Sequence, residues 1–111
     1  AARLSHWDFM LERGESLRTW ALQLQPDSPE PQLAEALADH RLAYLEYEGA
    51  VSGGRGSVAR WDAGSYEPQD ETGGSDPSFS IRVAGSRMRG EVKLLLVADA
   101  WQFQYFANSS E

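Results

Sequence analysis

The chain has 111 residues, a net charge of −7 and no cysteine. This length fits one domain with one core, so we treat residues 1–111 as a single domain. Without cysteine, disulfides and thiolate metal sites are excluded, and any metal must be held by histidine, carboxylate or backbone oxygen, which suits Mn, Mg or Zn.

The acidic net charge argues against a protein that binds DNA or RNA through a broadly basic surface. Nine of the ten basic residues are arginine, however, and a few guanidinium groups can bind phosphate in bidentate fashion. No apolar run is long enough to cross a bilayer, and no basic segment precedes an apolar one at the N-terminus. We therefore expect a soluble, cytoplasmic protein without membrane contacts.

Residues 5–12 predict the first strand. Their alternation puts the polar side chains on one face and the apolar ones on the other: His6, Asp8, Met10 and Glu12 against Trp7, Phe9 and Leu11. An imidazole and a carboxylate two residues apart lie roughly 6 to 7 Å apart along a strand, close enough to share one ion or phosphate. The plainer alternative is a solvated pair or a local hydrogen bond, which is the commoner role of a His-x-Asp pair near a terminus.

Residues 13–15 predict a hairpin turn, and residues 16–23 a second strand whose two faces are both mixed in polarity. Three prolines between residues 26 and 31 predict a loop. The last of them suits the first turn of a short helix from Pro31 to Asp39, with an apolar stripe of Leu33, Ala34 and Leu37. This is the only helix that the sequence predicts.

His40 follows this helix and leads into a predicted strand over residues 42–48. It has the same parity as Tyr44, so both side chains could point into one site. For His40 alone, an interaction with the helix dipole is the commoner role. Residues 49–56 hold four glycines around Arg55, which allows close approach of backbone to a ligand, but a flexible hairpin connection explains this segment more simply.

The rest of the chain has a β pattern. Strands are predicted over residues 57–62, 65–67, 79–83, 91–98 and 101–105, with an acidic loop over residues 68–77. Seven or eight short strands and one short helix favour a small antiparallel β-barrel. We expect the four tryptophans to be core residues rather than a base-stacking platform.

Several sequence blocks occur together in a recognisable order. Residues 6–12 read HWDFMLE, residues 17–22 read LRTWAL, residues 39–44 read DHRLAY and residues 60–67 read RWDAGSYE. With the closing hairpin over residues 79–96, these blocks resemble the 3′-phosphoesterase domain of bacterial DNA ligase D. The resemblance covers about residues 5–97 in the right order, so it does not depend on a single motif.

The resemblance implies a compact β-barrel enzyme that removes a 3′-terminal phosphate or ribonucleotide from a DNA primer end with a divalent metal such as manganese. By position, it makes His6 and Asp8 metal ligands. It makes His40 and Tyr44 the residues that engage the phosphate and assist the leaving group. The implied context is non-homologous end joining, the partner is the 3′ end of a primer-template, and DNA ligase or polymerase repair proteins are further expected partners.

The sequence departs from the family pattern at four positions. The family's first metal-binding histidine, upstream of the His-x-Asp pair, has no match in residues 1–5, and three phosphate-binding cations are replaced by Met10, Leu24 and Gln32. Arg55 and Arg60 are the expected substitutes for this lost charge. These departures indicate a divergent free-standing member of the family or one trimmed at its N-terminus.

Two other functions are compatible with the sequence. One is a catalytically silent barrel that binds DNA ends or a repair partner, which the lost cations and the acidic charge favour. The other is an unrelated small β-domain whose histidines and aspartates are structural.

Overall fold

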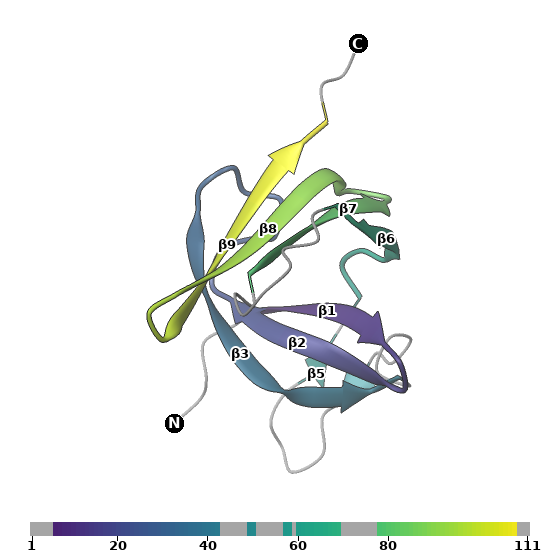
Figure 1. Cartoon of the computed structure of the whole chain (residues 1–111). Helices are drawn as coiled ribbons and strands as arrows, with labels where there is room; N and C mark the ends of the chain where they lie inside the picture. Colours follow the sequence, from purple (N-terminus) through teal and green to yellow (C-terminus); the bar gives the residue numbers. More distant parts are fainter. Residues whose placement is uncertain (1–5, 43–48, 51–56, 59, 70–77, 109–111) are drawn as a thin grey trace.

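One curled antiparallel sheet makes up most of the molecule. The computed structural model describes residues 6–42, 49–50, 57–58, 60–69 and 78–108. The sheet has seven strands in the order β1-β2-β3-β9-β8-β7-β6, and β4 pairs with β5 in a separate two-stranded sheet. Figure 1 shows the large sheet curling into a half-barrel, with β1–β3 as one wall and β6–β9 as the other. The strands are β1 Trp7–Arg13, β2 Ser16–Leu22, β3 Gln32–Arg41, β4 Gly49–Ala50, β5 Ser57–Val58, β6 Gly64–Pro68, β7 Phe79–Gly85, β8 Arg89–Val97 and β9 Ala100–Ala107.

The predicted antiparallel β fold is confirmed, including the first hairpin turn. Arg13 pairs with Ser16, so only two residues connect β1 to β2. Gly14 has a φ of +63°, which glycine adopts without steric cost and which suits a tight hairpin. Among the described residues, no helix is long and apolar enough to cross a membrane.

The helix predicted from Pro31 to Asp39 is wrong, because this segment forms strand β3. The burial of its first residues alternates as in a strand: Gln32 and Ala34 are buried, whereas Leu33 is 71% exposed. β3 pairs with β2 on one side and with β9 on the other. If this segment were a helix, the backbone groups of β2 and β9 that face it would lose their hydrogen-bond partners. Pairing with these two strands therefore outweighs the helix-like spacing of Leu33, Ala34 and Leu37.

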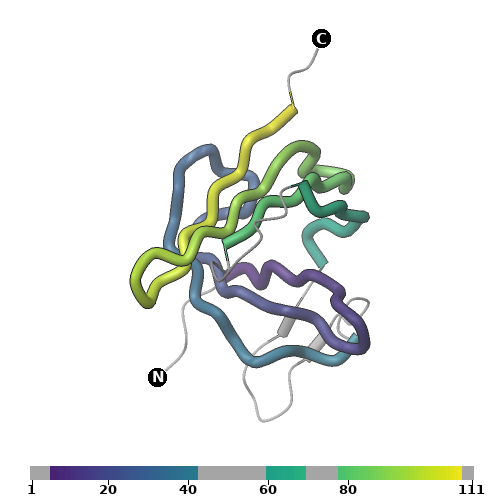
Figure 2. The backbone as a smooth tube through the Cα atoms, in the orientation of Figure 1, coloured from purple at the N-terminus to yellow at the C-terminus, as the bar shows by residue number. Residues whose placement is uncertain are grey.

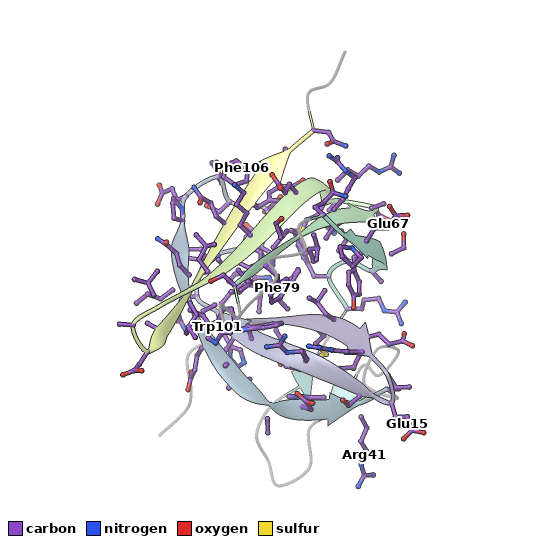
Figure 3. The ribbon with its side chains drawn as sticks, viewed as in Figure 1. Glu15, Arg41, Glu67, Phe79, Trp101 and Phe106 are labelled. Atoms are coloured by element: carbon purple, nitrogen blue, oxygen red, sulfur yellow. The ribbon has the colours of Figure 1, made fainter. Side chains whose placement is uncertain are left out.

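The main core lies inside the curl of the sheet. Trp20 is 1% exposed and packs beside the rings of Phe79 and Trp101, with centroid distances of 5.8 and 5.7 Å. Figure 2 traces the two walls that enclose this space, and Figure 3 labels Phe79 of β7 and Trp101 of β9, which both belong to the β6–β9 wall. Trp7, Trp61 and Trp101 are partly buried against the core, so the tryptophans are core residues as expected.

Strand β2 is buried on both of its faces. Trp20 and Leu22 face the main core, whereas Leu17, Thr19 and Ala21, on the other face, are also buried. A strand covered on both sides need not alternate in polarity. This double burial explains why the sequence of residues 16–23 shows no clear polar face.

A tyrosine links the two edge strands of the half-barrel. The hydroxyl of Tyr66 on β6 donates a hydrogen bond to the backbone carbonyl of Glu12 on β1. These two strands are the ends of the sheet order, and no strand pairing joins them among the described residues. The hydrogen bond therefore draws the open edges together at one end of the half-barrel.

Candidate functional site

His6 and Asp8 lie together at the start of β1. The imidazole Nε2 of His6 is 3.1 Å from the carboxylate Oδ1 of Asp8, and the two side chains are 24% and 21% exposed. Asp8 pairs with Ala21 of β2, a central strand of this wall, so its backbone is fixed by the ladder. The structure thus brings together the two residues that the sequence predicts as a metal half-site.

The contact between His6 and Asp8 does not have hydrogen-bond geometry. Asp8 Oδ1 is buried, and no donor in the described part of the chain bonds to it. Two ligands at right angles around one cation, with bonds of about 2.1 Å, lie about 3.0 Å apart. The 3.1 Å separation matches this spacing, and an imidazole with a carboxylate is a suitable donor set for a divalent ion. These two residues therefore fit a divalent metal as adjacent ligands.

The described residues supply two ligands of such a site. Among them, no cluster of three or more histidines, aspartates and glutamates could hold a metal ion. A catalytic metal usually keeps three protein ligands and leaves one position to water or substrate. The pair alone would hold a metal weakly.

His40 is on the same face of the β1–β3 wall as Asp8. It pairs with Leu17, which pairs with Glu12, while Asp8 pairs with Ala21. Directly opposed residues share a face, and so do alternate residues along β1. From strand spacing and rise, the backbones of Asp8 and His40 are roughly 16 Å apart, across two strands and four residues. The two groups thus lie towards opposite ends of one face, and Leu17, Thr19 and Ala21 on that face are buried.

The tautomer of His40 follows from its neighbour. Its Nδ1 is 3.1 Å from the backbone carbonyl of Ala38, which can only accept a hydrogen bond. We therefore assign the proton of the neutral ring to Nδ1, which leaves Nε2 as the basic nitrogen. A common site with Tyr44 stays a prediction, because Tyr44 is outside the described residues, as is Arg55. Arg60 is described and exposed, immediately before Trp61.

Two of the uncharged residues that stand where the family has cations, Leu24 and Gln32, contact each other. The side-chain amide of Gln32 accepts a hydrogen bond from the backbone N–H of Leu24 at 2.9 Å and donates one to its carbonyl at 3.2 Å. Gln32 is buried, so its amide ties the loop before β3 to the end of β2. The third replacement, Met10, lines an open hollow of about 390 Å³ with Glu12, Gly14, Gly64, Ser65 and Tyr66.

Asp62 has a structural role that the sequence analysis missed. Its two carboxylate oxygens accept four backbone hydrogen bonds of 2.8 to 3.0 Å, from Ala63, Ser86, Arg87 and Met88. Burial raises the pKa of Asp62, but the four donors together outweigh burial and hold the pKa below its ordinary value. The carboxylate thereby fixes the turn between β7 and β8, whose donors lie more than twenty residues away in sequence.

We expect Asp62→Asn to lower the free energy of unfolding by about 2–3 kcal/mol, because the neutral amide offers one acceptor oxygen to four donors. The lowered pKa means that the stabilisation is present above the ordinary carboxyl pKa and is lost as the pH falls through the folded value. Urea unfolding between pH 7 and pH 3 should show this loss in the unaltered chain and not in Asp62→Asn. The exposed Asp27→Asn is the control, and an equal effect there would contradict the assignment.

Comparison with known proteins identifies the family. The family model for the DNA Ligase D 3′-phosphoesterase domain matches residues 1–96. The chain belongs to this family. The resemblance seen in the sequence blocks is therefore confirmed.

Individual relatives agree with the family model. The chain is 33% identical over 102 residues to the multifunctional non-homologous end joining protein LigD of Pseudomonas aeruginosa, which covers 86% of this chain and 12% of that protein. It is 32% identical over 119 residues to the protein of the same name from Mycobacterium bovis, covering 99% of this chain and 15% of the relative. The chain thus spans only a small part of the length of these relatives.

Proposed function

We propose that this domain is a divalent-metal-dependent phosphoesterase that heals DNA 3′ ends by removing a terminal phosphate or ribonucleotide. Membership of the ligase D 3′-phosphoesterase family supports an end-processing role in DNA repair. The observation that carries the proposal is the His6–Asp8 pair, whose nitrogen and oxygen lie 3.1 Å apart without a hydrogen bond.

His6 and Asp8 are the proposed ligands of the metal, with manganese as the expected ion. When bound, a hard cation supplies Lewis-acid polarisation of the phosphoryl oxygens and neutralises charge that develops on them. Asp8 contributes the negative charge and His6 a neutral nitrogen donor. Asp8 lies on β1 and His6 immediately precedes this strand, so the local backbone keeps the two side chains close.

His40 is the proposed proton-transfer residue. Hydrolysis adds water to phosphorus and breaks the bond between phosphorus and the 3′ oxygen, which then takes up a proton to become the 3′ hydroxyl. In its protonated form His40 can donate that proton through Nε2, provided that substrate binding brings the ring within hydrogen-bond reach, because its backbone lies roughly 16 Å from that of Asp8. Tyr44 is the residue proposed to assist His40 at the leaving group, and Arg55 and Arg60 are proposed to bind the substrate phosphate.

A silent module that binds DNA ends or a repair partner is the second candidate. Gln32 supports it, because its amide is used by the Leu24 backbone and so takes a structural role at a position where the family has a phosphate-binding arginine. Met10 is likewise uncharged on the face that carries Asp8. Such a module would bind primer ends and leave them chemically unchanged.

The two candidates differ in what happens to a labelled end. We would incubate the chain and Mn²⁺ with a primer-template that carries a 3′-phosphate, and with the same duplex carrying only a 5′-phosphate. The proposal expects conversion of the 3′-phosphate to a 3′-hydroxyl, seen as a mobility change on a denaturing gel, and an intact 5′-phosphate. Binding of the duplex without conversion would favour the silent module, and equal loss of both phosphates would refute end specificity.

A further inference from the structure

Two exposed arginines stand at the turn between β7 and β8. Arg87 lies in the turn and Arg89 begins β8; we call them the turn arginines. Within the described residues, neither guanidinium has a carboxylate at ion-pairing distance. The carboxylate nearest to this turn, Asp62, uses both of its oxygens to accept backbone N–H groups, so it does not form an ion pair with either guanidinium.

Both turn arginines are oriented by the protein itself. Arg87 Nε donates to the backbone carbonyl of Trp61 at 2.9 Å, and its guanidinium carbon lies 5.0 Å from the centre of the Trp61 ring. Arg89 Nε donates to the backbone carbonyl of Gly85 at 2.9 Å. Each bond uses the inner nitrogen of the guanidinium, so the two outer Nη groups of each arginine remain at the exposed end.

The turn beneath these arginines is held in place by Asp62. The carboxylate accepts the backbone N–H groups of Arg87 and its two neighbours, and Met88, between the turn arginines, is buried. A Cβ at Gly85 would lie only 2.7 Å from an Asp62 oxygen, so a larger residue there would displace the carboxylate from its backbone donors. A rigid base reduces the entropy that the arginines would lose on binding a ligand.

We propose that Arg87 and Arg89 bind phosphates of the DNA duplex backbone, each contacting one phosphate through its Nη groups. Guanidinium groups match phosphate oxygens in planar, bidentate geometry, and two oriented ones form a ready anion-binding surface. This inference rests on the proposed function, since it takes DNA as the ligand. It adds a second contact that holds the duplex while its end occupies the face of Asp8 and His40.

Arg82 on β7 provides a matched control. It pairs across the sheet with Glu67 on β6 and with Glu91 on β8, and its Nη1 donates to Asn108 Oδ1 at 3.1 Å. Figure 3 shows Glu67 at the outer edge of this wall. Flanking carboxylates offset the charge of Arg82, so it should contribute little to phosphate binding although it is exposed and close in sequence.

The test measures binding of the chain to a fluorescent primer-template with a 3′-hydroxyl, by anisotropy over a range of salt concentrations. Each phosphate contact adds about 0.9 to the slope of log affinity against log salt, so Arg87→Gln with Arg89→Gln should lower the slope by about 2. Arg82→Gln should change it by much less. An unchanged slope in the double variant, or an equal fall in Arg82→Gln, would overturn the inference.

Lysine variants separate loss of charge from damage to the turn. The double variant Arg87→Lys with Arg89→Lys loses the Nε hydrogen bonds to Trp61 and Gly85 but keeps both positive charges. Because the salt dependence of binding follows charge, most of the slope of log affinity against log salt should remain. A fall as large as in the glutamine variants would mean that the turn, and not the charge, had been lost. The same slope change is expected with a 3′-phosphate primer; a change seen only with that primer would assign the arginines to the terminal phosphate instead.

The salt-slope experiment and the phosphate-release experiment can fail independently of each other. If the unaltered chain releases phosphate but the slope does not depend on the turn arginines, this inference fails and the enzyme remains. If the slope falls as expected but no phosphate is released, the duplex contact stands and the enzyme fails. Absence of DNA binding by the unaltered chain would overturn the inference.

Discussion

Asp8→Ala should abolish manganese-dependent phosphate release and weaken Mn²⁺ binding at least 100-fold. Asp8 is the one anionic ligand in the proposed pair, so its loss leaves the cation held by one neutral imidazole. Loss of an outer-shell partner alone typically costs about 10–100-fold in metal affinity, and a direct ligand should cost no less. Isothermal titration with Mn²⁺ gives the affinity, and a phosphate-release assay gives the rate.

The control for Asp8 is Asp99→Ala, an exposed carboxylate in the turn between β8 and β9. It removes the same charge far from β1 in the sequence and should leave both readouts unchanged. If Asp8→Ala binds Mn²⁺ as well as Asp99→Ala does, the 3.1 Å contact between His6 and Asp8 is a local ion pair and nothing more.

His40→Gln should lower the rate of phosphate release by about 10²–10⁴-fold, the usual contribution of a positioned proton donor. Glutamine can still form a hydrogen bond, but it has no proton to exchange near neutral pH. The variant should keep the Mn²⁺ affinity of the unaltered chain, because His40 is roughly 16 Å along the face from Asp8 by backbone spacing.

The neighbouring Arg41→Gln serves as the control for His40, since Arg41 is an exposed residue at the end of the same strand. Its rate of phosphate release should match that of the unaltered chain. A His40→Gln variant with a full rate of phosphate release would remove His40 from the proton-transfer role.

The sequence predicts the hairpins well because their causes are local. Period-2 alternation in residues 79–83 and 101–105 and a glycine at the first turn are enough to place β7, β9 and the β1–β2 connection. β3 could not be predicted in this way. Its strand state depends on pairing with β2 and with β9, and β9 lies about seventy residues later in the chain.

The candidate site was predictable where both members are neighbours in sequence at the start of one strand. His6 and Asp8 are two residues apart, so strand periodicity alone brings them to one face. Gln32 and Asp62 gave no such signal, because their roles depend on distant partners: the Leu24 backbone for one, and the turn at residues 86–88 for the other. Family resemblance supplied the role of His40, which a lone histidine after a predicted helix would not have indicated.

One measurement tests the central claim most directly. Inorganic phosphate released from a 3′-phosphate primer-template by the unaltered chain would be followed with Mn²⁺ present and again after chelation with EDTA. The account predicts multiple turnovers with Mn²⁺, a 3′-hydroxyl product, and a rate that falls to the protein-free background after chelation. Release at the protein-free background in both conditions, from a folded chain that binds the duplex, would contradict it.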